Sequence, residues 1–582
     1  MENKLKLAKQ IGNEITQFLT ESVTITNNIK HSQSKLLNRI SLFENQVYPS
    51  GKFDSQGNYK YWYDIITTRI ESEIKNIDFD TKDINVYSQI KNDELPVLIV
   101  NLKLKEYLRE TGQAEEINSA IEEGSGWGNI VWKKTKEGYE RVDLRNFYVI
   151  NQSARTLNET PAIERHQLTA QDMRAKRDVW NNVDAVLEEC KTKTYKTTTG
   201  TQEKETTVPY YEVYERNGEI SVADFKEYQG ETPSKGDSDK YILAKVIGAG
   251  VKSTSSGADI KYIMFAEEIK NMPYEEYHRS RYKGRWFREG LYELLFDLQV
   301  RANQIGNQIA QGLELASKTV LRSTDKLIVQ NILTDIRNGD IIRAKDLEQV
   351  QLRMDAFDQL ANEWNRVINL ANDIANSREI VMGITPASGT PLGTSKLLNQ
   401  NAGKLFDFIR EKLAIPYTRI FERSVVPKLI KELSQQEILR LTGDSDMLGR
   451  LHKVIVDDWY LQNLPLLPPH TPEIADNLKQ EKLDELLQRP QLLMKATKDM
   501  FKRFKPRVSV VITGEQVNLD AELQTMMGFI KLEQDPVRRS AMIGVAMRKA
   551  GVDVGSLPQS PPQPIQPQPQ PATQALPSKA TA

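Results

Sequence analysis

Two long helical patterns in the second half of the chain constrain its fold most. Apolar residues recur three or four positions apart from Leu291 to Ile309, which predicts a helix of about seven turns with one apolar stripe. A second stripe of this kind runs through 356–381. The sequence therefore predicts two long helices close to each other along the chain.

Uncharged amide side chains fill most of the other positions of both helices, where a solvated helix would more often carry Glu and Lys. An amide can hydrogen-bond to a neighbouring helix without the desolvation cost of burying a charge. We therefore predict that these faces meet another copy of the chain. The expected inter-subunit residues are Gln299, Asn303, Gln304, Asn307, Gln308, Gln311, Asn365, Asn369 and Asn372.

Length and composition are typical of a large globular protein. The chain has 582 residues, more than one ordinary domain, so two or more packed regions are expected. It has no apolar run of about eighteen residues, and its start lacks the apolar centre of a signal peptide, so we expect a cytoplasmic protein that does not insert in a membrane. The net charge of −1 argues against a strongly basic surface that grips nucleic acid.

The single cysteine, Cys190, excludes an intramolecular disulfide and a multi-thiolate zinc site. It fits a reducing cytosol. Its expected role is that of a packing or surface residue.

The first half of the chain combines helices with a β-rich section. Helical spacing covers the first 45 residues, 62–74 and 95–110. Strands are expected in 124–134, 137–151 and 190–265. Within the last of these ranges, Asn217-Gly218 signals a turn, and the polar residues 192–207 indicate an exposed hairpin.

The second half is predicted to be helical from residue 284, with two interruptions. A short strand-rich insert occupies 318–355. The three glycines and two prolines of 383–396 exclude a continuous helix there, so we expect a loop. The next helix, to about Leu433, should kink at Pro416, because proline lacks the backbone N–H.

The end of the chain is predicted to change character. A strand at 507–515 is followed by a helix to about Ala550. The Pro/Gln-rich residues 556–582 favour an extended, disordered tail. The fold class expected for the whole chain is α+β, mainly helical.

No constellation of residues predicts an enzyme. The histidines are scattered without a second histidine at helical spacing, so each is expected to be an ordinary surface or packing residue. These are His31, His166, His278, His452 and His470. Gly124, Gly126 and Gly128 precede a strand instead of a phosphate-binding helix, which favours a tight turn between strands.

A phosphate loop is not expected at Gly393-Thr394-Ser395-Lys396 either, because that motif needs its lysine before the hydroxyl residue. We therefore expect no catalytic residue, no metal site and no cofactor.

The basic and aromatic run 277–290 has two interpretations, which the sequence supports about equally. Its cations and aromatic rings have the composition of a surface that contacts phosphates and stacks on bases, or of a contact between subunits. Alternatively, the arginines pair with acidic neighbours such as Glu275, Glu276 and Glu289. The cations concerned are Arg279, Arg281, Lys283, Arg285 and Arg288.

The order of these segments resembles the portal (head-to-tail connector) proteins of tailed bacteriophages. A GSGWGNIVWKK strand pair, a basic-aromatic entry, an amide-rich helix, a strand insert, a second amide-rich helix, a Gly/Pro loop and a kinked helix follow one another. The resemblance covers roughly residues 1–550 and rests on this order of segments, without an invariant motif.

The resemblance implies a portal-like protomer with a helical crown, in the following order. Residues 1–283 would form the wing, 284–317 and 356–382 the two stem helices, 318–355 a small α/β clip, 383–396 the tunnel loop, 397–506 the kinked helix and its return into the wing, 507–555 the crown, and 556–582 the tail. The residues expected to line a DNA channel are Thr385, Ser388, Thr390, Thr394, Ser395, Lys396 and Lys404.

The resemblance also implies a function. Portal proteins assemble as a dodecamer at one capsid vertex of the virion, and double-stranded DNA passes through the ring during genome packaging and ejection. Expected partners are sister subunits, the major capsid protein, the terminase packaging motor and tail adaptor proteins. Another phage structural or adaptor protein is the first alternative, and a nucleic-acid-processing enzyme is the second.

Overall fold

The computed structural model describes most of the chain. The described residues are 2–20, 23–26, 29–55, 57–77, 79–88, 93–135, 138–199, 202–254, 257–317, 321–322, 348–349, 355–376, 392–442, 445–464, 472–510, 527–531, 539 and 543. The chain divides into two units, Met1–Ile512 and Thr513–Ala582. The fold described below is that of the first unit. It is mixed α+β and mainly helical, which confirms the predicted class.

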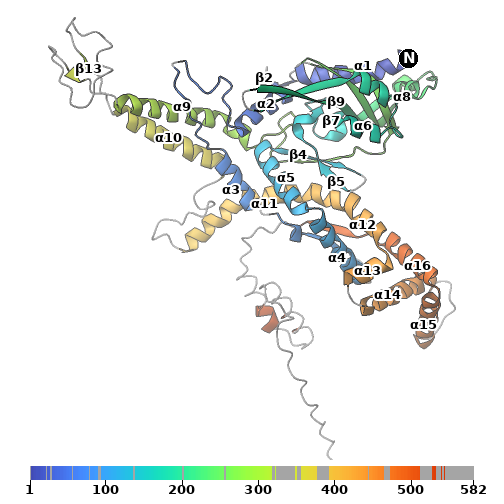
Figure 1. Cartoon of the computed structure of the whole chain (residues 1–582). Coiled ribbons are helices and arrows are strands. Elements are labelled where there is room, and N and C mark those ends of the chain that lie inside the picture. Colours follow the sequence, from blue (N-terminus) through green and yellow to red (C-terminus); the bar gives the residue numbers. More distant parts are fainter. Residues whose placement is uncertain are drawn as a thin grey trace, which may run out of the picture. The chain divides into compact units, whose positions relative to one another are not determined.

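An antiparallel sheet forms the β-rich part of the molecule (Figure 1). Its strands lie in the order β11, β10, β9, β7, β6, and β8 pairs with β9. They are β6 (Phe147–Val149), β7 (Ala162–Thr169), β8 (Lys191–Thr199), β9 (Gln202–Ser221), β10 (Tyr241–Thr254) and β11 (Gly257–Glu268). The pairing of β8 with β9 confirms a hairpin at 192–207.

Helices cover both faces of this sheet. α1 (Glu2–Thr20) and α8 (Val222–Gln229) bury apolar side chains on one face, and α6 (Ala170–Ala175) and α7 (Val183–Glu189) on the other. Val246 belongs to the first of these cores and Ile247 to the second. Adjacent residues of β10 thus point to opposite faces, as the period-two geometry of a strand requires.

The turn predicted at Asn217-Gly218 is wrong, because both residues lie inside β9. Position 218 requires glycine because a side chain there would collide with Pro161. A Cβ at this position would lie 2.7 Å from Pro161 Cα. The glycine at position 218 therefore marks a close approach of two backbone segments, and not a reversal of the chain.

The first unit also contains a smaller sheet and four helices that precede β4 in the chain. The small sheet has the order β12 (Tyr274–His278), β4 (Asn129–Lys134), β5 (Tyr139–Arg141). The helices are α2 (Gln33–Glu44), α3 (Thr67–Ile77), α4 (Glu94–Glu110) and α5 (Gln113–Trp127). The remaining short elements of this half of the chain are β1 (Val23–Thr26), β2 (Ile29–His31), β3 (Ile84–Tyr87) and 3-10 turns at Thr81–Asp83, Leu144–Asn146, Leu157–Glu159 and Asp237–Asp239.

The predicted strand pair is confirmed for β4 and β5, but it begins later than expected. Gly124 and Gly126 lie in α5, and only Gly128 lies outside the helix, at its C-terminal end with a φ of 87°. A glycine that ends a helix in the left-handed conformation is a common C-terminal cap. The expected tight turn between strands is therefore a helix end.

Two long helices lie side by side in a hairpin (Figure 1). They are α9 (Leu291–Ser317) and α10 (Asp355–Ile374). Beyond α9 the short strand β13 (Leu321–Arg322) pairs with β14 (Glu348–Gln349), which precedes α10. Because these strands join the end of α9 to the start of α10, the two helices run in opposite directions.

The remaining helices build the largest core, together with α4 and α5. They are α11 (Leu392–Ile420), α12 (Val426–Glu432), α13 (Gln435–Thr442), α14 (Ser445–Asn463), α15 (Pro472–Gln488) and α16 (Pro490–Arg503). Pro416 lies inside α11, and a π-helical turn at Phe421–Val425 follows before α12. Such a turn is the kind of disturbance expected close to a proline.

The last strand, β15 (Arg507–Val510), pairs with β3 and adds to the same core. The segment boundary expected at residue 507 therefore falls inside a packed region. In the described part of the chain, none of the helices is long and apolar enough to span a bilayer.

Candidate functional site

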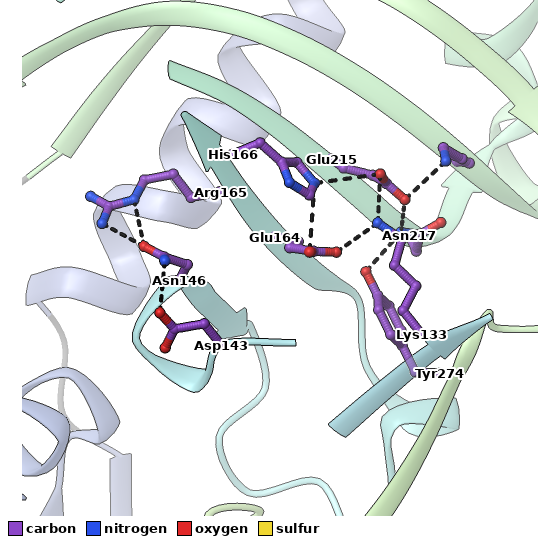
Figure 2. A network of polar contacts seen from close by, with 10 residues as sticks. Lys133, Asp143, Asn146, Glu164, Arg165, His166, Glu215, Asn217 and Tyr274 are labelled. Carbon is purple, nitrogen blue, oxygen red and sulfur yellow. Dashed lines mark hydrogen bonds and ion pairs between the residues drawn. The ribbon is translucent and has the colours of Figure 1, made fainter. Parts of the chain in front are cut away.

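A buried cluster of charged side chains connects the large sheet with the small one (Figure 2). Glu164 of β7 and Glu215 of β9 are direct cross-strand neighbours. Lys133 of β4 contacts both, with its Nζ 2.7 Å from Glu164 Oε2 and 2.8 Å from Glu215 Oε2. Two adjacent carboxylates repel each other, so the shared ammonium group is what makes their burial tolerable.

Further polar groups complete the cluster. Lys245 Nζ lies 3.0 Å from Glu215 Oε1, and Asn217 Nδ2 donates to the same oxygen at 3.1 Å. Burial raises the pKa of Glu215, but His166, Lys133 and Lys245 outweigh burial, so its pKa is lowered overall. The side chain therefore remains a carboxylate at neutral pH.

One group of described residues has the geometry of three metal ligands: Glu164, His166 and Glu215, whose ligand atoms lie within 4.8 Å of one another. His166 Nε2 is 3.7 Å from Glu164 and 3.6 Å from Glu215, beyond hydrogen-bond distance. The ammonium group of Lys133 already lies between the two carboxylates, and Lys245 supplies a second positive charge. The cluster is thus balanced in charge and does not favour a divalent cation.

Sequence reasoning treated His166 as an ordinary residue and did not find this cluster. Its members come from β4, β7 and β9, which are far apart in the sequence. The available signal was a charged residue within each strand: Lys133, Glu164 and Glu215.

The basic and aromatic run 277–290 is mostly used within the protein itself. Arg279 donates to both carboxylate oxygens of Glu73 at 2.7 Å, and Arg285 donates to both oxygens of Glu293 at 2.8 Å. Both arginines are buried. Charge-assisted bidentate pairs of this kind are strong, so these two cations are not available to phosphates.

The rest of the run follows the same pattern. Lys283 Nζ lies 2.5 Å from Glu289, one of the acidic partners expected from the sequence, and Arg288 donates to the backbone oxygens of Ser280 and Arg155. Trp286 and Phe287 are buried in the core. Only Arg281 and Lys283 among the predicted contacts are exposed. The packing interpretation therefore describes this segment better than a nucleic-acid surface.

The amide-rich face of α9 binds a segment of its own chain. The described residues of 54–65, which we call the strap, lie along the helix, and their backbone hydrogen-bonds to amides four positions apart. Gln299 Oε1 accepts from the N–H of Ile65 at 2.9 Å, and Asn303 Oδ1 accepts from the N–H of Tyr63 at 2.8 Å. These two amides, which were predicted to meet another copy of the chain, thus bind their own chain.

The same contact continues along the helix. Asn307 accepts from the N–H of Tyr61 at 2.7 Å and donates to its carbonyl oxygen at 2.9 Å, and Gln311 donates to Asp54 at 2.9 Å. Four helical residues rise ~6 Å and two extended residues ~6.6 Å, so the two series stay in register. The helix predicted from residue 62 accordingly starts only at Thr67.

The other predicted stem residues have different surroundings. Gln304, Gln308, Asn365 and Asn369 are exposed. Asn372 accepts from Arg69 Nη2 at 2.7 Å, again within the chain. Four of the nine amides thus remain free to contact another molecule.

The predicted channel loop is only partly described. Thr385, Ser388 and Thr390 lie outside the described residues. Thr394, Ser395 and Lys396 lie in the first turns of α11, which begins at Leu392, and Lys404 lies further along the same helix. The loop expected to extend to 396 therefore ends earlier.

A cavity of about 410 Å³ lies between α3, α5 and α9, lined by acidic groups, Trp127 and Tyr292. Burial raises the pKa of Glu123 to about 8, although Arg141 Nη1 lies 2.7 Å away and opposes the shift. A second cleft of about 700 Å³ lies between β4, β12 and the π-helical turn, where Arg423 pairs with Glu275 at 3.0 Å.

Comparison with known proteins gives no further assignment. No protein-family model matches the sequence, and a search of curated proteins finds no match either.

Proposed function

We propose that the chain is a portal protein of a tailed bacteriophage, a subunit of a ring-shaped channel at one capsid vertex through which DNA is packaged and ejected. The observation that carries the proposal is the α9–α10 hairpin, with the paired strands β13 and β14 at its far end (Figure 1). A two-helix stem that connects a small strand-containing tip to a larger body is the arrangement that this function requires.

The outer surface of the hairpin supports self-assembly. Leu313 of α9 is 51% exposed and Leu370 of α10 is 49% exposed. The exposed amides Gln304, Gln308 and Asn369 lie on the same two helices. Large apolar side chains and uncharged amides together form a surface that favours burial against another subunit over contact with water.

The internal pairing of Arg279 and Arg285 is compatible with a DNA conduit. Every phosphate that a protein neutralises adds salt-dependent binding affinity, which would hinder the sliding of DNA through the channel. The chain is nearly neutral, and arginines of its basic run 277–290 are paired with carboxylates, so tight binding of this kind is avoided. In this proposal the segment 383–396 lines the DNA channel, and the motor and tail proteins dock at 318–355.

The first experiment is mass photometry and negative-stain imaging of the purified chain. We expect closed rings, and Leu370→Glu should shift the protein toward smaller species, because a charge would be buried between subunits. Val179→Glu, at a position that is 63% exposed and distant in sequence from the hairpin, is the control and should leave the rings intact.

A protein that stays monomeric at high concentration would count against the portal and favour an adaptor or capsid-associated protein. Turnover of ATP or DNA by the purified chain would favour the enzyme alternative.

A further inference from the structure

Three large aromatic side chains are displayed together on the strap and the hairpin that leads into it. Phe53 is 61% exposed, Tyr59 46% and Tyr61 54%. Their rings contact one another, with centroids 5.8 Å apart for Phe53–Tyr59 and 5.2 Å for Tyr59–Tyr61. We call these three residues the aromatic patch. Contiguous exposed rings of this kind usually mark a binding surface.

The backbone holds the patch in a fixed geometry. Phe53 and Tyr59 form a β-bridge, and Lys60 donates its N–H to Lys52 O at 2.9 Å. Asn307 accepts a hydrogen bond from the N–H of Tyr61 and donates one to its carbonyl oxygen. Since these rings are already ordered, a ligand that binds them would lose little conformational entropy of the protein.

Flat rings with a hydroxyl at one end are the surface that polyproline II ligands prefer, because proline rings pack on aromatic faces. Such a ligand has three residues per turn, so prolines spaced by three lie on one edge, ~9 Å apart. The contacting rings of this patch present apolar faces and edges against which the proline rings of such a ligand pack.

The chain carries a ligand of this class in its own sequence. Pro558, Pro561, Pro564 and Pro567 form three overlapping P-x-x-P repeats, and residues 556–582 contain a single charged residue, Lys579.

We propose that the aromatic patch is a docking site for polyproline II segments and that its occupant is the Pro/Gln-rich tail, residues 556–571, of a sister chain. This inference is independent of the portal proposal, because it rests on the strap and the composition of the tail. It gives the tail a role as a tether between two copies of the chain.

The test uses full-length protein and a fluorescent synthetic peptide of residues 556–571. Replacing Pro558, Pro561, Pro564 and Pro567 by Ala in the full chain removes the competing tail, and the peptide should bind this variant more tightly than wild type. Adding Tyr59→Ala and Tyr61→Ala should weaken peptide binding about tenfold or more, as is common when aromatic anchors are removed. Binding is measured by fluorescence anisotropy.

The control is Tyr241→Ala in the same background, because Tyr241 is 65% exposed on β10, away from the strap. It should leave the peptide affinity unchanged. All variants should also keep the unfolding midpoint of the parent protein, since the altered side chains are exposed.

Three results would overturn the proposal. The first is peptide affinity unaffected by the loss of both tyrosines, and the second is the absence of peptide binding at millimolar concentration. The third is binding that weakens steeply with salt, because an uncharged peptide should be insensitive to salt. The third result would instead favour a charged occupant, attracted by Lys52 and Lys60.

Discussion

The two helices of the hairpin share a pattern of apolar and amide residues, but their amides have different environments. On α9, amides four positions apart bind the backbone of the strap, whereas on α10 Asn365 and Asn369 face solvent. Both helices have one apolar stripe and a face rich in Asn and Gln. The difference teaches that an amide-rich face indicates a need for hydrogen-bond partners, but not whether the partner is a remote segment of the same chain or another molecule.

The largest effect is expected for Gln299→Ala. Gln299 is fully buried, and its loss leaves the N–H of Ile65 and the carbonyl of Tyr63 without this partner. Each buried group without a partner costs ~1–3 kcal/mol, so the free energy of unfolding should fall by about 3 kcal/mol. Urea denaturation measures this change. Gln304→Ala, one turn away on the exposed side, is the control and should change it by less than about 0.5 kcal/mol.

A smaller effect is expected for Asn307→Ala at the outer part of the strap. Tyr61 is exposed, so water can replace the two lost hydrogen bonds to its backbone. The free energy of unfolding should fall by about 1 kcal/mol. If Asn307→Ala destabilised the protein as much as Gln299→Ala, the gradient of burial along the contact would not explain the energetics.

The double variant Asn365→Ala and Asn369→Ala should change the unfolding free energy of the monomer by less than about 0.5 kcal/mol, because both side chains are exposed. It should nevertheless lower the fraction of assembled rings in mass photometry. A loss of monomer stability comparable with that of Gln299→Ala would mean that α10 resembles α9 after all.

The smallest effect concerns pH. No amide of the strap contact titrates, so the free-energy difference between Gln299→Ala and wild type should stay constant within about 0.3 kcal/mol from pH 5 to 9. Denaturation series at several pH values measure it. A difference that varies strongly with pH would show that a titrating group contributes to the contact.

Glu123→Gln is the contrasting variant for this series. Burial raises the pKa of Glu123 from 4.5 to about 8, so the folded state holds a proton that the unfolded chain releases. The stabilising effect of that proton is complete below pH 4.5, declines as the pH rises toward 8 and is lost above it. The difference between Glu123→Gln and wild type should therefore change across this range.

Local patterns predicted much of the secondary structure. The ranges of α4, of α9 and α10 and of the β-rich section follow from periodicity of 3.6 or 2 residues, because each of these elements buries one regular face. Predictions that depended on single residues were less successful. Gly124, Gly126 and Asn217-Gly218 suggested turns but lie in a helix and a strand, where burial and close packing decide their conformation.

The candidate sites were predicted less well than the fold. The run 277–290 has the composition of a nucleic-acid surface, but the partner of Arg279 is Glu73, two hundred residues earlier in the chain. Tyr59, Tyr61 and Tyr63 alternate with other residues, which is the pattern of an extended segment. The prediction of a helix at 62–74 did not take this pattern into account, and the helix begins only at Thr67.

The sequence by itself determined which faces are apolar and where the long helices lie, because these properties depend on the spacing and type of neighbouring residues. Only the tertiary structure decided the partners: Lys133 between Glu164 and Glu215, Arg279 on Glu73, and the strap on α9. The physical reason is that a buried polar group must be paired, but many remote groups of the right chemistry can satisfy it, and only the folded backbone selects among them.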